Sequence, residues 1–121
     1  MASTALDEIS DDDARILHEA LRRSAVSLGL TCRELGDMVG VSVQFFSRQP
    51  GRLSTKQAEL SKLILRAHQS LSDITAGNKR NMRHWIETQN HALNGTPKDR
   101  MKTISGLVAT VEYLEAHRGE L

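Results

Sequence analysis

Side chains that could support catalysis or hold a metal ion are present in the chain, but they form no recognisable site. Three neighbouring acids, Asp11 to Asp13, offer carboxylates, although acids at a helix start usually interact with its positive dipole end. The single cysteine, Cys32, falls where a helix is expected to begin, which would stabilise a thiolate, but no histidine is near it in the sequence. The histidines are scattered and form no His-x-x-x-His pair of the kind that binds zinc; they are His18, His68, His84, His91 and His117. We therefore expect no enzymatic activity, no metal and no cofactor.

Other side chains are of the types that contact DNA. A helix expected after Gly40 would carry Gln44 and Arg48 on its outward face, where Gln can pair with adenine and Arg with guanine. Polar and basic residues near helix ends commonly contact phosphates. The predicted DNA-binding residues are Thr31, Arg33, Ser42, Val43, Gln44, Ser47, Arg48 and Arg52. The alternative is a helical hairpin that only packs within the protein and touches no DNA.

A helix-turn-helix over about residues 31–49 would position these side chains. Thr31 and Glu34 have the spacing of a capping box, which predicts the start of the first of two short helices. Gly36 would lie where the two helices pass closest, and a larger residue there would push them apart. Gly40 would occupy the tight turn, because a positive φ is favourable mainly for glycine.

The second helix of this motif is expected to begin at Ser42 and to end before Pro50 and Gly51. The chain has two phenylalanines, and both lie in this segment. Phe46 falls on the inner face and is predicted to anchor the helix in the core. Phe45 would point toward the first helix, the fourth helix or a partner.

The chain as a whole is predicted to be all-α, with a helix-turn-helix bundle followed by a small helical domain. It has 121 residues, of which 39% are hydrophobic and only 3% aromatic, and it contains two prolines and few β-branched runs. We place the N-terminal region at residues 1–76 and the C-terminal domain at 77–121. Further helices are predicted from Ser10 to Gly29, from Ser54 or Thr55 to Gly77, from about Asn78 to Thr88, from Pro97 with Thr96 as its cap, and from just after Ser105 and Gly106 to Arg118 and Gly119.

Charge is distributed unevenly along the chain. The net charge is +1, but residues 1–20 carry six acids and one base, which leaves fifteen bases and nine acids in the rest. A basic body permits contact with an anionic polymer, although a solubilising surface has the same composition. No apolar run is long enough to span a bilayer, and one cysteine gives no disulfide within the chain, so we expect a cytoplasmic protein without a membrane partner.

The segment "HWIETQNHALNGTPKDRMKTISGLVATVEYLEAHRG" resembles the C-terminal toxin-binding domain of the MbcA/ParS/Xre antitoxin family. Residues 30–60 resemble the Xre-type helix-turn-helix that usually precedes it, so that the likeness covers roughly residues 28–119. One departure is Gln89, which stands where the family often has proline before the asparagine. The matching residues of the C-terminal segment are Trp85, Asn90, Leu93, Gly95, Pro97, Met101, Thr103, Gly106, Val111 and Leu114.

The resemblance implies an antitoxin that binds and neutralises a RES-domain toxin, which consumes NAD or transfers ADP-ribose, and that represses its own operon. It also implies a homodimer and a heteromeric complex with the toxin. The residues expected to face the toxin are Asn94, Glu112, Glu115, His117 and Arg118. From the residues alone, the outer side of the final helix could equally be a solvated charged face, and Trp85 fits the core better than a contact surface. Two alternatives remain: a transcriptional regulator without a toxin, and a neutraliser that does not bind DNA.

Overall fold

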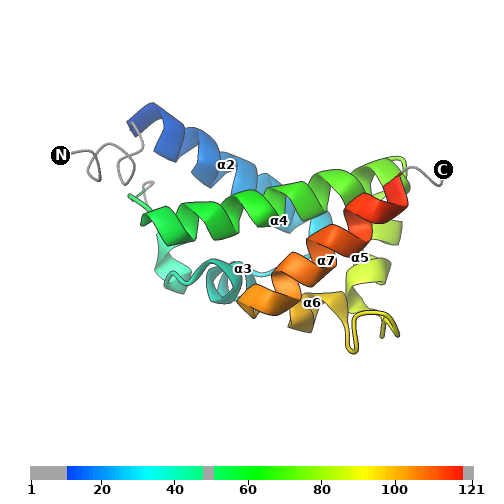
Figure 1. Cartoon of the computed structure of the whole chain (residues 1–121). Coiled ribbons are helices and arrows are strands. Elements are labelled where there is room, and N and C mark those ends of the chain that lie inside the picture. Colours follow the sequence, from blue (N-terminus) through cyan, green and yellow to red (C-terminus); the bar gives the residue numbers. More distant parts are fainter. Residues whose placement is uncertain (1–10, 48–50, 119–121) are drawn as a thin grey trace.

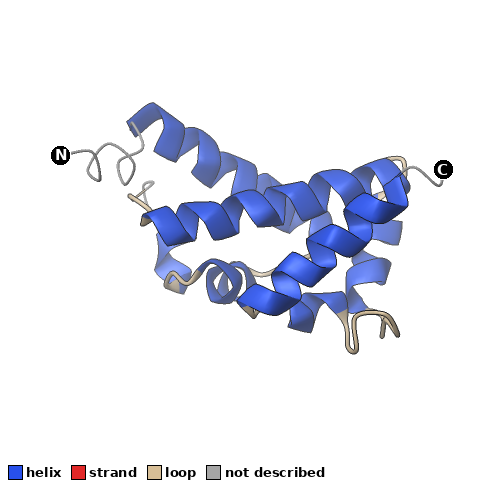
Figure 2. Cartoon of the chain, viewed as in Figure 1, coloured by secondary structure: helices blue, strands red, loops and turns tan. Residues whose placement is uncertain are grey.

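The computed structural model describes residues 11–47 and 51–118, and these residues are helical with connecting loops and no strand (Figure 2). The prediction of an all-α fold is therefore confirmed. A single isolated bridge pairs Asn90 with Gly95. The helices are α2 (Asp11–Leu28), α3 (Cys32–Val39), the one-turn 3₁₀ helix η1 (Val43–Phe46), α4 (Thr55–Ile74), α5 (Lys79–Glu87), α6 (Pro97–Arg100) and α7 (Ile104–His117).

Helix α4 is the central element, with α2 along one side and α7 along another (Figure 1). Its buried face contains several small residues, which allow the neighbouring helices to approach closely. The hydroxyl of Ser61 is fully buried and donates to the Gln57 carbonyl at 2.7 Å, so this polar side chain is satisfied within its own helix. The buried residues of α4 are Ala58, Ser61, Ile64, Ala67, Ser70 and Leu71.

The two phenylalanines have the different roles that the sequence predicts. Phe46 is 2% exposed and lies in the core, whereas Phe45 is half-buried and packs against the core edge. The ring of His18 from α2 lies over both, with ring centroids 5.4 Å from Phe45 and 5.5 Å from Phe46. His18 Nε2 also lies 3.1 Å from the carbonyl oxygen of Phe45. Phe45 therefore points toward α2, one of the directions expected for it.

Helix α3 begins at the predicted capping box. The Glu34 amide donates to Thr31 Oγ1 at 3.0 Å, and the Thr31 amide donates to Glu34 Oε1 at 2.9 Å. Gly40 ends the helix with φ +88°, a conformation that glycine adopts without strain. Gly36 is required for a close approach, because a Cβ there would lie 2.7 Å from the carbonyl oxygen of Val41. That neighbour belongs to the turn itself and not to the next helix.

The predicted helix from Ser42 to residue 49 is wrong in its extent. Among the described residues it is only the four-residue 3₁₀ turn η1, and Ser42 precedes it without a capping hydrogen bond from its side chain. The sequence explains a short element, because β-branched and aromatic residues form helices poorly and Pro50 leaves room for little more than two turns. Arg48 and Pro50 lie outside the described residues.

The last helix begins earlier than predicted. Thr103 caps α7 by accepting a hydrogen bond from the Gly106 amide at 3.1 Å, so that Gly106 lies in the first turn and does not separate two helices. A Cβ at Gly106 would lie 1.9 Å from the carbonyl oxygen of Arg100. The glycine is therefore needed where α7 crosses the end of α6. The predicted caps of α2 and α7 at Ser10 and Gly119 lie outside the described residues.

Candidate functional site

The outer side of α7 carries an apolar stripe that the structure leaves uncovered. Ile104 is 51% exposed and Val108 is 37% exposed, one helical turn apart, and the exposed Glu112 follows one turn later. An apolar residue between Leu107 and Val111 in the sequence is expected on the inner face of the helix, but Val108 lies on the outer face. Thr110 takes a buried position instead, because its hydroxyl donates to the Gly106 carbonyl at 2.8 Å and is satisfied there.

Two of the residues predicted to face a toxin are paired with α4. Arg66 donates two hydrogen bonds to the Glu115 carboxylate, at 3.0 Å from Nε and 2.6 Å from Nη2. These hydrogen bonds from Arg66 lower the pKa of Glu115 below its ordinary value. Arg118 forms an ion pair with Asp73 near the end of α4. Both pairs are partly exposed, so they orient α7 on α4 more than they stabilise the fold.

The same end of α7 carries a short row of rings. Tyr113 lies 6.1 Å from Trp85 of α5 in a stacked arrangement, and its ring centroid is 4.2 Å from that of His117. His117 Nδ1 lies 2.7 Å from the Tyr113 carbonyl oxygen. Trp85 is half-buried and packs against the core, as an inner-face residue should, and its stacking partner Tyr113 is half-buried as well. His117 thus lies within this row of rings, on the same helix as Glu112.

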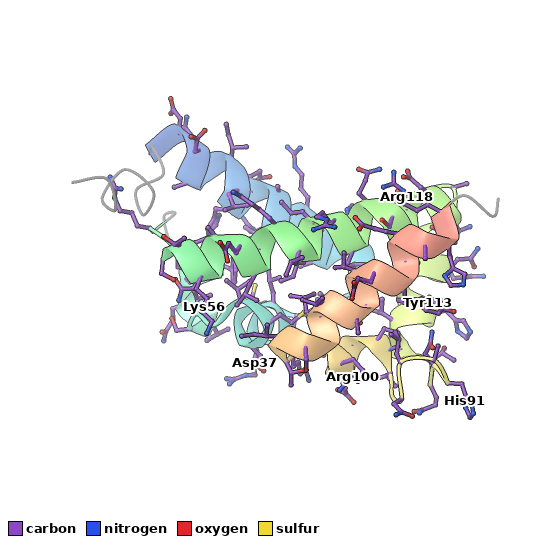
Figure 3. The ribbon with its side chains drawn as sticks, in the orientation of Figure 1. Asp37, Lys56, His91, Arg100, Tyr113 and Arg118 are labelled. Atoms are coloured by element: carbon purple, nitrogen blue, oxygen red, sulfur yellow. The ribbon has the colours of Figure 1, made fainter. Side chains whose placement is uncertain are left out.

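The loop between α5 and α6 presents Asn94 at the surface. Asn90 and Gly95 exchange backbone hydrogen bonds of 2.9 and 3.3 Å, and Asn90 Oδ1 accepts from the Leu93 amide at 3.1 Å. Leu93 is buried beneath the loop, and Asn94 adopts φ +60° with an exposed side chain. Asparagine tolerates this conformation better than most residues. Figure 3 shows His91 of the same loop at the edge of the molecule, well away from Arg118.

Of the predicted DNA-binding residues, Ser42, Val43, Gln44 and Ser47 lie at the turn between α3 and η1 or just after it, whereas Thr31 and Arg33 lie at the other end of α3. Gln44, Val43 and Ser47 are exposed, and the Ser47 hydroxyl donates to the Gln44 carbonyl at 3.1 Å. The turn is fixed from α4, because Gln57 Nε2 donates to the Gly40 carbonyl at 2.8 Å. The remaining predicted residues that the structure describes are exposed as well; they are Thr31, Arg33, Ser42 and Arg52.

An ion pair joins α3 to the C-terminal elements. Lys98 of α6 lies 3.2 Å from Glu34 and 3.5 Å from Glu87 of α5. The hydrogen bond from the Thr31 amide, together with Lys98, lowers the pKa of Glu34 below its ordinary value. The capping box of α3 is thus tied to the segment that the sequence assigns to a separate domain, and α4 is packed against both parts.

The apolar stripe is the feature that reasoning from the sequence missed. A signal for it was available, because α7 has apolar residues on all of its sides, which is typical of a helix covered by more than one neighbour. In the part of the chain that the structure describes, no group of three His, Cys, Asp or Glu side chains could hold a metal ion. No helix there is both long and apolar enough to cross a membrane.

Residues 70–119 match the family model of the antitoxin Xre/MbcA/ParS C-terminal toxin-binding domain. The match begins near the end of α4 and includes α5, α6, α7 and the loop that carries Asn94. A search of curated proteins found no match to the chain. The matched segment makes up less than half of the chain, and it is this segment that is similar to a toxin-binding antitoxin domain.

Proposed function

We propose that this chain is an antitoxin that neutralises a RES-domain toxin by covering part of its surface with the outer side of α7. The observation that carries the proposal is the exposed pair Ile104 and Val108, which lies within the segment matched by the toxin-binding model. Exposed apolar residues that are neighbours on a helix are typical of an interface, whereas isolated ones are common on any surface.

The charged residues near the stripe have different roles in this proposal. Glu112 is exposed and forms no ion pair among the described residues, so it is available for a basic group of the toxin. Glu115 and Arg118 are engaged with α4 and serve to hold α7 in place. Asn94 and His117 extend the contact surface on the loop and at the end of α7. The toxin-facing face is thus more apolar than the sequence suggests.

The test is to express the chain beside the product of the adjacent gene and to measure survival, cellular NAD and co-purification. We expect a stable complex, and we expect NAD to fall when the toxin is expressed alone and to recover when the chain is present. Glu112→Lys should weaken protection, and Glu59→Lys at an exposed position of α4 is the control with the same change of charge. Recovery of growth without recovery of NAD would contradict the RES assignment, and the absence of any complex would contradict the antitoxin proposal.

We further propose that the turn between α3 and η1 binds the operator of the same genes, as a homodimer. The exposed Gln44 and Val43 next to a rigid glycine turn support it, although η1 offers a shorter face than a full recognition helix. Gln44→Ala combined with Arg48→Ala should remove sequence preference, since a good base contact provides ~1–3 kcal/mol of discrimination. Full retention of preference by this double variant would contradict the assignment and would favour a neutraliser that does not read DNA.

A further inference from the structure

A basic surface lies on the opposite half of α2 from the η1 turn, where α2 packs against α5 (Figure 1). Two segments contain basic residues and no acid. One runs from residue 20 to the end of α2 at Leu28, and the other is the part of α5 from Lys79 to residue 86. We call this the α2–α5 basic surface. Its residues are Arg22, Arg23, Lys79, Arg80 and Arg83, all of them exposed.

Part of this surface is hollowed. Arg22, Arg23 and Lys79 line a surface hollow together with Val26 and Ser27, and the one acid at its edge is Glu19. Glu19 lies 3.2 Å from Arg23 and therefore compensates one of the three cations. Arg22 and Lys79 form no ion pair among the described residues, so two uncompensated charges from different helices face the same hollow.

The two helices are held together at this place. Arg83 of α5 donates a hydrogen bond of 2.8 Å to the Val26 carbonyl near the end of α2. The same side chain packs across the turn that follows α2, because a Cβ at Gly29 would lie 3.0 Å from its Cγ. The relative placement of the two helices that carry the cations is therefore supported by a direct contact.

We propose that the α2–α5 basic surface binds the phosphate backbone of duplex nucleic acid. Cations from two rigidly joined helices match a ligand whose negative charges repeat along a line, whereas a single anion would need only one cluster. The surface is distinct from the α3–η1 turn, which packs against the first half of α2 through His18 and Phe45. The contact carries no sequence information and does not depend on readout by Gln44.

The test is the salt dependence of binding to a short DNA duplex of arbitrary sequence, measured by fluorescence anisotropy. Arg22→Gln combined with Lys79→Gln should make the negative slope of log K against log salt shallower by about 1.8, because each lost phosphate contact reduces its magnitude by about 0.9. The control is Lys62→Gln with Lys102→Gln, which removes the same charge from exposed positions outside the hollow. The control should leave the slope within about 0.3 of the wild type, and circular dichroism should show both variants folded.

Three results would overturn the proposal. The first is a wild-type chain that does not bind the duplex even at about 50 mM salt, and the second is an equal slope for the two double variants. The third is a loss of toxin binding by the Arg22 and Lys79 variant with an unchanged DNA slope, which would assign the surface to a protein partner. Loss of sequence preference in the Gln44 variant has no bearing on this slope, so the two DNA proposals fail separately.

Discussion

Replacing Gly106 by alanine should separate α7 from the end of α6. The added Cβ would lie 1.9 Å from the Arg100 carbonyl oxygen, 2.7 Å from the Arg100 carbonyl carbon and 2.8 Å from Thr103 Oγ1. Because two of these atoms are backbone, the conflict is relieved only by moving a helix, which costs about 1–3 kcal/mol or more. Disturbing the Thr103 cap increases the loss of unfolding free energy by about 1 kcal/mol. The higher helix propensity of alanine offsets about 1 kcal/mol of this loss.

The net expectation for Gly106→Ala is a loss of about 1–3 kcal/mol of unfolding free energy. For a chain of this size, that corresponds to a melting temperature lower by roughly 4 to 15 °C, measured by circular dichroism at fixed concentration. Ser105→Ala is the control, because Ser105 is the neighbouring helical residue and its side chain is exposed. It should change the stability by less than about 0.5 kcal/mol. A Gly106→Ala variant that melts at or above the wild-type temperature would refute the close packing of α6 and α7.

Two further predictions concern the core and the capping box. Phe46→Ala should lose ~3–5 kcal/mol of stability, because Phe46 is fully buried, and Phe45→Ala should lose less; thermal melts that reverse this order would contradict the placement of η1. The folded-state pKa of Glu34 is depressed, so its stabilising effect is present above its ordinary pKa of 4.5 and is lost as the pH falls through the lower folded value. Compared with Glu34→Gln, the wild type should therefore lose its advantage in melting temperature below about pH 4.5. An advantage that persists at low pH would contradict stabilisation of the charged carboxylate by the Thr31 amide and Lys98.

The elements with strong local signals were predictable from the sequence. The side chains of the capping box formed by Thr31 and Glu34, and of the cap at Thr96, satisfy helix-terminal amides where the sequence predicts them. Gly40 ends α3 with the positive φ that glycine favours, also as predicted. Local chemistry of this kind depends on residues three or four positions apart, so it does not need the tertiary structure.

The sequence predictions are wrong at positions whose burial is determined by tertiary contacts. Gly106 looks like a break between helices, but its lack of a side chain serves the close crossing at Arg100. Thr110 looks like a surface residue, but it is buried because its hydroxyl is satisfied within its own helix. With Gly106 and Thr110 among the buried residues of α7, Val108 lies outside the buried face, and the apolar stripe remains exposed.

The sequence places the candidate site in the C-terminal segment but does not reveal which of its side chains are paired within the protein. The resemblance and the family match agree on the C-terminal segment, where Asn94 adopts a positive φ that asparagine tolerates. The pairing of Glu115 with Arg66 and of Arg118 with Asp73 joins residues far apart in the chain, and no spacing rule reveals such pairs. The domain boundary after residue 76 remains a prediction.

The most direct test of the account is the dissociation constant of the toxin complex for Ile104→Asp combined with Val108→Asp. Complete burial of such side chains contributes about 1.5–3 kcal/mol each, and about half and a third of their surfaces remain available. Their loss should therefore weaken binding roughly 10- to 100-fold. The control, Ile16→Asp with Val26→Asp, changes two exposed apolar residues of α2 and should leave the constant within about threefold of the wild type. An unchanged constant for the α7 variant, or an equal loss for both, would contradict binding through the outer side of α7.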